Sequence, residues 1–182
     1  MLADFWQYFF SLVWLFLPAG AANMMASLSR WIDFLDCPVD FGKSLKNKRI
    51  FGNHKTWRGL FFGMIAAVLV AYLQVRFYTP DKFYYIYDYT KLNFLALGIL
   101  SASGALLGDL FRCFIKRRKN IMPGTLWFPY DQIDWIAGAI ITMSFYIQIS
   151  WQNAIAAVAL SIIIHPLINY ICFLLKLQKN KF

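Results

Sequence analysis

The sequence predicts an all-α, polytopic integral membrane protein with about five transmembrane helices. Hydrophobic residues make up 60% of the 182 positions and the mean hydropathy is +0.51, whereas a soluble domain is about 45 to 50% apolar. At about 20 residues per transmembrane helix, this apolar content is enough for roughly five spans. Only 15% of the residues are charged, so the net charge of +9 indicates a cytoplasmic membrane face, and no nucleic-acid partner is expected.

The expected spans follow the apolar stretches of the chain. The first contains Pro18 and Gly20, whose helix-breaking effect neighbouring helices can compensate inside a bilayer. The last two follow each other almost directly, as a helical hairpin requires. The five spans are expected over residues 5–27, 57–77, 92–115, 133–150 and 151–175. Polar loops are expected over 29–56 and 116–130, and the whole chain, 1–182, is expected to form one membrane-embedded domain.

The distribution of basic residues predicts the orientation. Of the 18 Lys and Arg, 13 fall in the loops 29–56 and 116–130 and in the C-terminal tail, whereas the opposite connections hold only Lys82 and Lys91. By the positive-inside rule, the N-terminus is outside and the C-terminus and both polar loops are cytoplasmic. The expected location is therefore the cell (inner) membrane, with several spans and the polar loops facing the cytoplasm.

The first polar loop carries a candidate phosphate site. Lys55, Thr56 and Arg58 lie where the loop enters the second span, and the free N–H groups and dipole of a helix N-terminus favour an anion. The alternative is a basic segment that contacts anionic lipid headgroups, with glycines that pack against another helix. The candidate phosphate-binding residues are Lys43, Gly52, Lys55, Thr56, Arg58 and Gly59.

The second polar region carries a candidate metal site. The chain has no Glu, and Asp109 lies about two turns inside the third span, where an ionisable residue indicates a functional site. Asp131 and Asp134 share a helical face and could converge on a hard cation such as Mg²⁺. The alternatives are helix N-capping by Asp131 and Asp134, and an i, i+3 ion pair between Asp109 and Arg112.

Several motifs, in order along nearly the whole chain, together resemble the CDP-archaeol synthase family. That family is similar to the wider membrane cytidylyltransferases that make CDP-diacylglycerol. The motifs are Pro18 with Ala22-Asn23, Pro38-x-Asp40-x-Gly42-Lys43, Gly52-x-x-Lys55-Thr56-Trp57-Arg58-Gly59, Gly108-Asp109, Lys116-Arg117-Arg118 and Asp131-Gln132-x-Asp134.

The resemblance implies a CTP-dependent nucleotidyltransferase. It would transfer a cytidylyl group from CTP to a membrane phosphoglycerol lipid, require Mg²⁺ and release pyrophosphate. The acceptor would be 2,3-bis-O-geranylgeranylglycerol phosphate or phosphatidate. The residues support the same outline, because in-line attack on a phosphate mainly requires positioning and neutralisation of phosphate charge.

The candidate residues take three roles in this chemistry. Those expected to bind the triphosphate and the lipid phosphate as catalytic residues are Lys55, Arg58, Lys116 and Arg117. Those expected to hold Mg²⁺ are Asp109, Asp131 and Asp134. Asn23 is expected to contact the lipid substrate, although an interhelical hydrogen bond is equally expected.

Other functions stay open at this point. The alternatives are a non-enzymatic transporter or scaffold with basic loops that bind anionic lipid, and a different lipid-phosphate transferase. A transporter usually concentrates polar residues near the middle of the bilayer, whereas this chain puts them at one interface. The residues do not determine the base, the lipid chains, a possible homodimer, or a role for His54 and His165.

Overall fold

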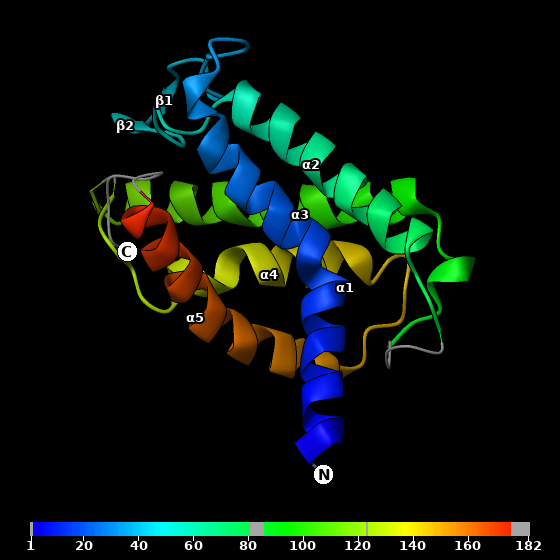
Figure 1. Cartoon of the computed structure of the whole chain (residues 1–182). Coiled ribbons are helices and arrows are strands. Elements are labelled where there is room, and N and C mark those ends of the chain that lie inside the picture. Colours follow the sequence, from blue (N-terminus) through cyan, green and yellow to red (C-terminus); the bar gives the residue numbers. More distant parts are fainter. Residues whose placement is uncertain (1, 81–85, 123, 176–182) are drawn as a thin grey trace.

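The computed structural model describes residues 2–80, 86–122 and 124–175. They form a mainly helical protein, as predicted (Figure 1). Its helices are α1 (Leu2–Leu28), η1 (Ser29–Trp31), α2 (Trp57–Arg76), η2 (Tyr89–Lys91), α3 (Phe94–Arg118), α4 (Tyr130–Met143) and α5 (Trp151–Leu174). The loop expected over 29–56 also contains an antiparallel hairpin, β1 (Ser44–Leu45) with β2 (Lys48–Arg49), which was not predicted. Lys82 and the tail, 176–182, used in the charge count, lie outside the described residues.

Three long helices begin at small polar residues that cap them. The Thr56 hydroxyl accepts from Gly59 N–H at the start of α2, and the Asn93 side chain accepts from the first N–H groups of α3. Ser150 does the same at the start of α5. Each cap supplies an acceptor for an N–H group that has no partner within the helix. The starts of these helices are therefore determined by local sequence.

Four described helices, α1, α2, α3 and α5, are long and apolar enough to cross a membrane. Helix α4 has 14 residues and is about 21 Å long, whereas the hydrocarbon core is about 30 Å thick. The span expected over 133–150 therefore differs from the helix observed. The chain turns after Met143 because the next segment contacts residues 87–93: the Tyr146 hydroxyl accepts from Asn93 N–H at 2.7 Å, and the Tyr87 hydroxyl donates to Gln148 O.

Small residues bring α1 and α2 into close contact. A Cβ atom added at Gly63 would lie 2.8 Å from the Ala22 carbonyl oxygen, and one added at Gly59 would lie 3.1 Å from that of Ala26. Backbones approach this closely only where side chains are small. The contact confirms the packing interpretation of these glycines and joins the start of α2 to the end of α1.

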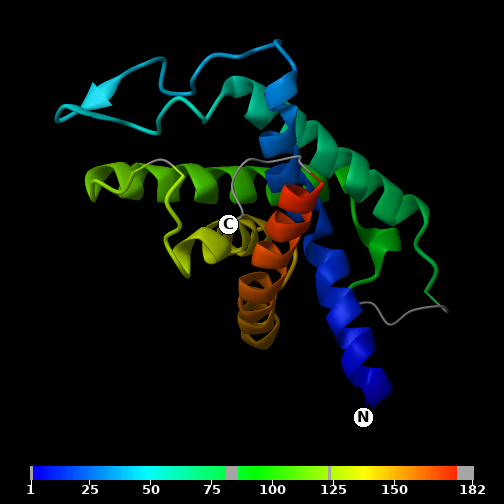
Figure 2. The ribbon, with the colours of Figure 1, turned by 60° about the vertical axis from the view of Figure 1, so that its left-hand side comes forward.

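Helices α3 and α4 approach even more closely, as antiparallel neighbours (Figure 2). A Cβ atom added at Gly104 would lie 2.3 Å from the Gly138 carbonyl oxygen, and one added at Gly108 would lie 2.1 Å from that of Asp134. The two backbones are thus in contact, with no space for a side chain. Because Asp109 follows Gly108 directly, this contact brings it beside Asp134.

The apolar core lies where α1 crosses α3 and α4. Leu15 of α1, Leu97 of α3, and Ile136 and Met143 of α4 are all buried there. Burial of apolar side chains between helices holds the relative positions of these elements through close packing. The packing of α1 against both helices therefore helps to hold α3 and α4 together.

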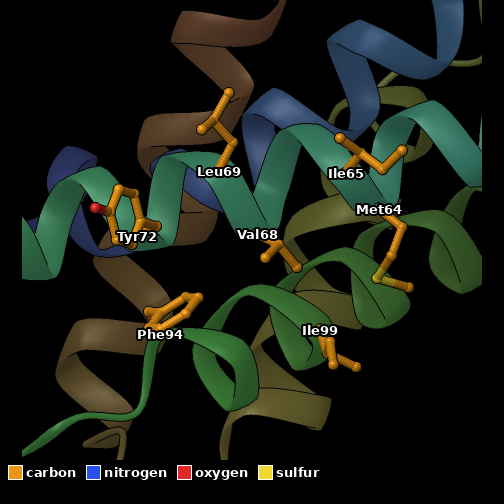
Figure 3. Close-up of a pocket in the computed structure, with 7 residues that line it drawn as sticks. All are labelled: Met64, Ile65, Val68, Leu69, Tyr72, Phe94 and Ile99. Carbon is orange, nitrogen blue, oxygen red and sulfur yellow. The ribbon is translucent and has the colours of Figure 1, made fainter.

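An apolar groove lies between α2 and α3 (Figure 3). Tyr72 of α2 and Phe94 of α3 pack edge to face at one end, with ring centroids 5.4 Å apart. Val68 of α2 and Ile99 of α3 line it further along. It follows the N-terminal half of α3, whereas the charged side chains described below belong to the C-terminal half.

We predict that Gly108→Ala lowers the free energy of unfolding by about 1 to 3 kcal/mol, the usual cost of overpacking a tight contact. The added methyl group meets backbone of α4, which cannot move aside as a flexible side chain can. The measurement is thermal or denaturant unfolding in detergent, followed by tryptophan fluorescence.

Gly20→Ala is the matched control, because a Cβ atom there would lie 3.9 Å from the Trp135 ring, an ordinary contact. In a helix this change should be neutral or slightly stabilising. Equal losses in both variants would contradict the importance of the α3–α4 contact.

Candidate functional site

A cluster of charged side chains joins the C-terminal half of α3 to the start of α4. At its centre, the three nitrogen atoms of the Arg112 guanidinium each contact a different carboxylate. Nη2 pairs with Asp109, Nη1 with Asp131 at 2.5 Å, and Nε with Asp134 at 2.6 Å. The three predicted metal ligands are thus brought together, with an arginine between them.

Two lysines complete the cluster. Lys55 reaches from the loop before α2 and forms an ion pair with Asp109. Lys116 places its Nζ atom 3.1 Å from both oxygens of Asp131 and donates to the Thr125 carbonyl oxygen at 2.6 Å. With Arg112, these lysines provide three cations for three carboxylates, so the charges balance. Such pairing is required because an unpaired charge away from water is strongly unfavourable.

Helical spacing explains how the cluster forms. Asp109, Arg112 and Lys116 follow each other at intervals of three and four residues and so lie on one face of α3. Asp131 and Asp134, three residues apart, both face Arg112, which confirms that they share a face of α4. The capping interpretation of Asp131 is not confirmed, because α4 begins without a side-chain cap. The Oδ2 atom of Asp131 instead accepts from Trp127 N–H, which lies before the helix, at 2.7 Å.

The loop that supplies Lys55 is organised by Asp40. The Asp40 carboxylate is fully buried and accepts hydrogen bonds from the N–H groups of Gly42, Phe51 and Gly52 and from the Arg49 guanidinium. Burial alone would raise its pKa, but these donors hold the pKa well below the usual range of a carboxyl group. The anchor therefore remains charged and is lost only when the pH falls through this lowered pKa.

Arg118 docks the β1–β2 hairpin onto the end of α3. Its guanidinium donates to the carbonyl oxygens of Leu45, Lys48 and Arg49, the last at 2.6 Å. In return, Lys48 Nζ donates to the Arg118 carbonyl oxygen at 3.2 Å. The hairpin is thus fixed to the same helix that carries Asp109 and Arg112.

Lys55 has an electrostatic environment that keeps it charged. Burial would lower the pKa of its amine, but the nearby Asp109 carboxylate raises the pKa above its ordinary value. The lysine therefore remains a cation at physiological pH. Among the candidate phosphate-binding residues of the first polar loop, it is the one that the structure brings directly to the carboxylates.

Other predicted residues lie outside the cluster. Arg58 is buried, but it pairs with Asp36 at 3.0 Å and donates to the Ile32 carbonyl oxygen, because the first turn of α2 packs against that segment. Thr56 caps α2 and Gly59 packs against α1, so both have structural roles. The expectation that Arg58 lies beside Lys55 at a shared phosphate site is not met in this structure.

Four further predicted residues lie around the cluster or away from it. Arg117 donates to the Ile121 carbonyl oxygen at 2.8 Å, and its Nε lies beside Gly52, where an added Cβ atom would come within 3.6 Å. Gly52 has a φ of +104°, which other residues rarely adopt. Lys43 is exposed at the start of the hairpin. Asn23 is half-buried in α1 and directly follows Ala22, which contacts α2.

The carboxylates fit the ligand chemistry of Mg²⁺, although they are not arranged for it here. All three donors are oxygens, which this hard cation prefers. Asp134 Oδ2 is buried and accepts no hydrogen bond, since the nearby Arg112 Nε–H is not directed at it. Among the described residues, no three acidic, histidine or cysteine side chains already surround one metal position.

Sequence reasoning missed two functional positions. Arg112 was considered only as an i, i+3 partner of Asp109, and this pair is confirmed, but its contacts with Asp131 and Asp134 require the fold of α4. Asp40 was part of a motif without an assigned role. The sequence signal was an acidic residue two positions before Gly42, and its partners Phe51 and Gly52 are more than ten residues away.

Residues 5–182 match the family described as CarS-like, CDP-archaeol synthase. A CDP-archaeol synthase from Pyrobaculum islandicum is 36% identical over 174 residues, which cover 95% of this chain and 96% of that protein. A CDP-archaeol synthase from Archaeoglobus fulgidus is 35% identical over 175 residues, which cover 92% and 94%.

The fold is similar to that of a solved intramembrane enzyme for archaeal membrane lipids biosynthesis. The TM-score is 0.68 and the sequence identity is 26%, and the match covers 86% of this chain and 91% of that chain. The similarity therefore includes most of both chains.

We predict that Asp40→Asn loosens the loop 38–56 while the helices stay folded. Loss of the charge weakens hydrogen bonds that are worth about 1.5 to 3 kcal/mol, so exchange of the Phe51 and Gly52 amides should become about 10- to 100-fold faster. Hydrogen–deuterium exchange with mass spectrometry in detergent measures this. Asp33→Asn, at an exposed position of the preceding segment, is the control, and equal effects of the two changes would refute the anchoring role.

Proposed function

Because the chain belongs to the CDP-archaeol synthase family, we propose that it is a membrane enzyme that uses CTP to activate an archaeal ether lipid. The acceptor is a phosphoglycerol lipid with isoprenoid chains, 2,3-bis-O-geranylgeranylglycerol phosphate. The names of the related proteins favour this lipid over phosphatidate. The products are a CDP-activated lipid and pyrophosphate.

The proposed reaction is an in-line substitution at phosphorus. An oxygen of the lipid phosphate attacks the α-phosphorus of CTP, a new P–O bond forms, and the bond from this phosphorus to the oxygen bridging to the β-phosphate breaks. The electron pair leaves with pyrophosphate. Because both reactants are anions, catalysis depends mainly on bringing them together and neutralising their charge.

The observation that carries this proposal is the largely buried cluster of Lys55, Arg112 and Lys116 with three aspartates. The lysines and the arginine are the side chains that phosphate oxygens require, and Lys55 lies one residue before the cap of α2. We assign Lys55 and Lys116 to the triphosphate. We assign Arg117, whose Nε lies beside Gly52, to the lipid phosphate.

Asp109, Asp131 and Asp134 would hold Mg²⁺ in this proposal, because they are the carboxylates of the cluster. When bound, the ion would neutralise phosphate charge and orient the triphosphate. The chain's own residues hold the substrates in position: Lys55 and Lys116 bind phosphate oxygens, and the loop anchored by Asp40 keeps Lys55 above Asp109.

The lipid is expected to approach along the apolar helices, with its chains in the bilayer and its phosphate at the cluster. Asn23 of α1 is our candidate for a polar contact to the lipid near this path. We further propose that the whole chain acts as one multi-pass membrane domain. Its N-terminus is outside and the loops 29–56 and 116–130 face the cytoplasm, where CTP is found.

The direct test is a transfer assay with purified protein. The protein is incubated with Mg²⁺, each of the four labelled nucleoside triphosphates in turn, and either the isoprenyl ether phosphate lipid or phosphatidate. We expect pyrophosphate and lipid-linked nucleotide with CTP and the ether lipid. Equal use of all four nucleotides, or no lipid-linked product, would refute the proposed reaction.

We predict that Lys55→Ala lowers kcat/KM for CTP by about 10- to 100-fold, because it removes a charged contact worth about 1.5 to 3 kcal/mol. Lys46→Ala is the control, since Lys46 is exposed in the turn of the hairpin and pairs with no carboxylate of the cluster. Steady-state rates and CTP affinity are measured in one detergent and lipid composition. Equal, small losses of kcat/KM in both variants would show that only the overall positive charge of the loop contributes to CTP use, and would contradict a specific role of Lys55.

We predict that Ser44→Cys is labelled by a membrane-impermeant maleimide only after cells are opened, because the hairpin faces the cytoplasm. Lys91→Cys, exposed in η2, should be labelled in intact cells. Both changes are made in a background without Cys37, Cys113 and Cys172. Labelling of position 44 from outside would reverse the orientation and rule out use of cytoplasmic CTP there.

A further inference from the structure

The Arg112 guanidinium occupies the position on which the three carboxylates converge. Its Nη2, Nη1 and Nε atoms contact Asp109, Asp131 and Asp134, and the Arg112 side chain is mostly buried. Asp109 uses its other oxygen for Lys55, and both oxygens of Asp131 contact Lys116. The arginine therefore occupies carboxylate oxygens that a metal ion at this position would need as ligands.

A divalent cation and this guanidinium compete for the same oxygens. Mg²⁺ needs short, near-octahedral contacts to oxygen, which a guanidinium lying among the carboxylates excludes. One contact is already imperfect, because neither Arg112 Nε nor Asp134 Oδ2 has a hydrogen-bond partner although they lie 2.6 Å apart. The guanidinium fork is equally suited to bind phosphate through two parallel hydrogen bonds.

We infer that Arg112 is an exchangeable counter-cation of the site. Without metal, it neutralises Asp109, Asp131 and Asp134 and holds α3 and α4 together through them. When the divalent cation binds these carboxylates, the guanidinium leaves them and binds a phosphate group of the nucleotide. This inference rests on the proposed function, since it assigns Arg112 to the substrate of the same site.

The exchange couples metal binding to nucleotide binding. Metal binding releases the guanidinium for phosphate, and phosphate binding removes the competitor of the metal. By thermodynamic linkage, each ligand raises the affinity for the other by the same factor. An arginine with only a structural role would add nothing to the coupling that Mg²⁺ itself produces through its contacts with phosphate, because it would stay on the carboxylates in every state.

The test compares Arg112→Gln with Arg76→Gln, an exposed arginine at the end of α2. Binding of Mg²⁺ alone is measured by the rise in unfolding temperature of metal-free protein across a Mg²⁺ titration. CTP binding is measured by calorimetry without lipid, at low and at saturating Mg²⁺. A charge-conserving variant, Arg112→Lys, shows whether the guanidinium fork is needed.

We expect Arg112→Gln to lower the unfolding temperature of metal-free protein, to bind Mg²⁺ about tenfold more tightly than the wild type, and to bind CTP at saturating Mg²⁺ about tenfold or more weakly. The dependence of CTP affinity on Mg²⁺ should shrink accordingly. Arg112→Lys should recover part of the metal-free stability but not the CTP affinity. Arg76→Gln should behave as wild type in every measurement.

Unchanged or weaker Mg²⁺ binding in Arg112→Gln would overturn the inference and leave Arg112 as a structural ion pair. If Arg112→Gln does not fold without metal, Mg²⁺ during purification must restore it, and failure to do so would also overturn the inference. The Mg²⁺ titration needs no turnover. A wild type that shows the Mg²⁺ competition but no transfer to lipid would therefore contradict the proposed function alone.

Discussion

The backbones of α3 and α4 touch at Gly104, Gly108 and Gly138, and the rest of the site depends on this contact. Without side chains between them, the two helices lie close enough for Asp109 and Arg112 of α3 to meet the aspartates of α4. A larger separation would leave these charged groups unpaired among apolar helices, at a high free-energy cost. Glycine is thus needed here for close approach of the helices.

The same contact determines how the charges are shared. Arg112 binds carboxylates from both helices, whereas Lys55 and Lys116 each bind one from a single helix. The arginine can do this because its planar fork carries donors in several directions, which a lysine lacks. The cluster is therefore a structural link between α3 and α4, and it gathers the cationic side chains that the proposed reaction needs.

A second polar assembly, in the loop 38–56, contacts α3 beside this cluster. Asp40 binds the backbone of its own loop, and Arg118 binds the hairpin of that loop to α3. The loop then delivers Lys55 to Asp109. Since Arg118 and Asp109 belong to the same helix, the positions of the loop and of the carboxylates are linked. The contacts of the hairpin with α3 thus help to hold Lys55 beside Asp109.

The sequence by itself determined the features that depend on neighbouring residues. Apolar stretches located the long helices, Thr56 at a helix N-terminus was identified correctly, and the three-residue spacing placed Asp131 and Asp134 on one face. These follow from helical geometry, which is local. The motif combination also identified the family, because several short patterns in order are specific together.

Only the tertiary structure decided which charged groups meet. Lys55 and Asp109 are 54 positions apart in the chain, and nothing local distinguishes Lys55, which reaches the cluster, from Arg58, which turns to Asp36. The end of α4 at Met143 likewise depends on the distant residues 87–93. Such choices result from competition among partners from different helices, and that competition is resolved only when the helices are packed together.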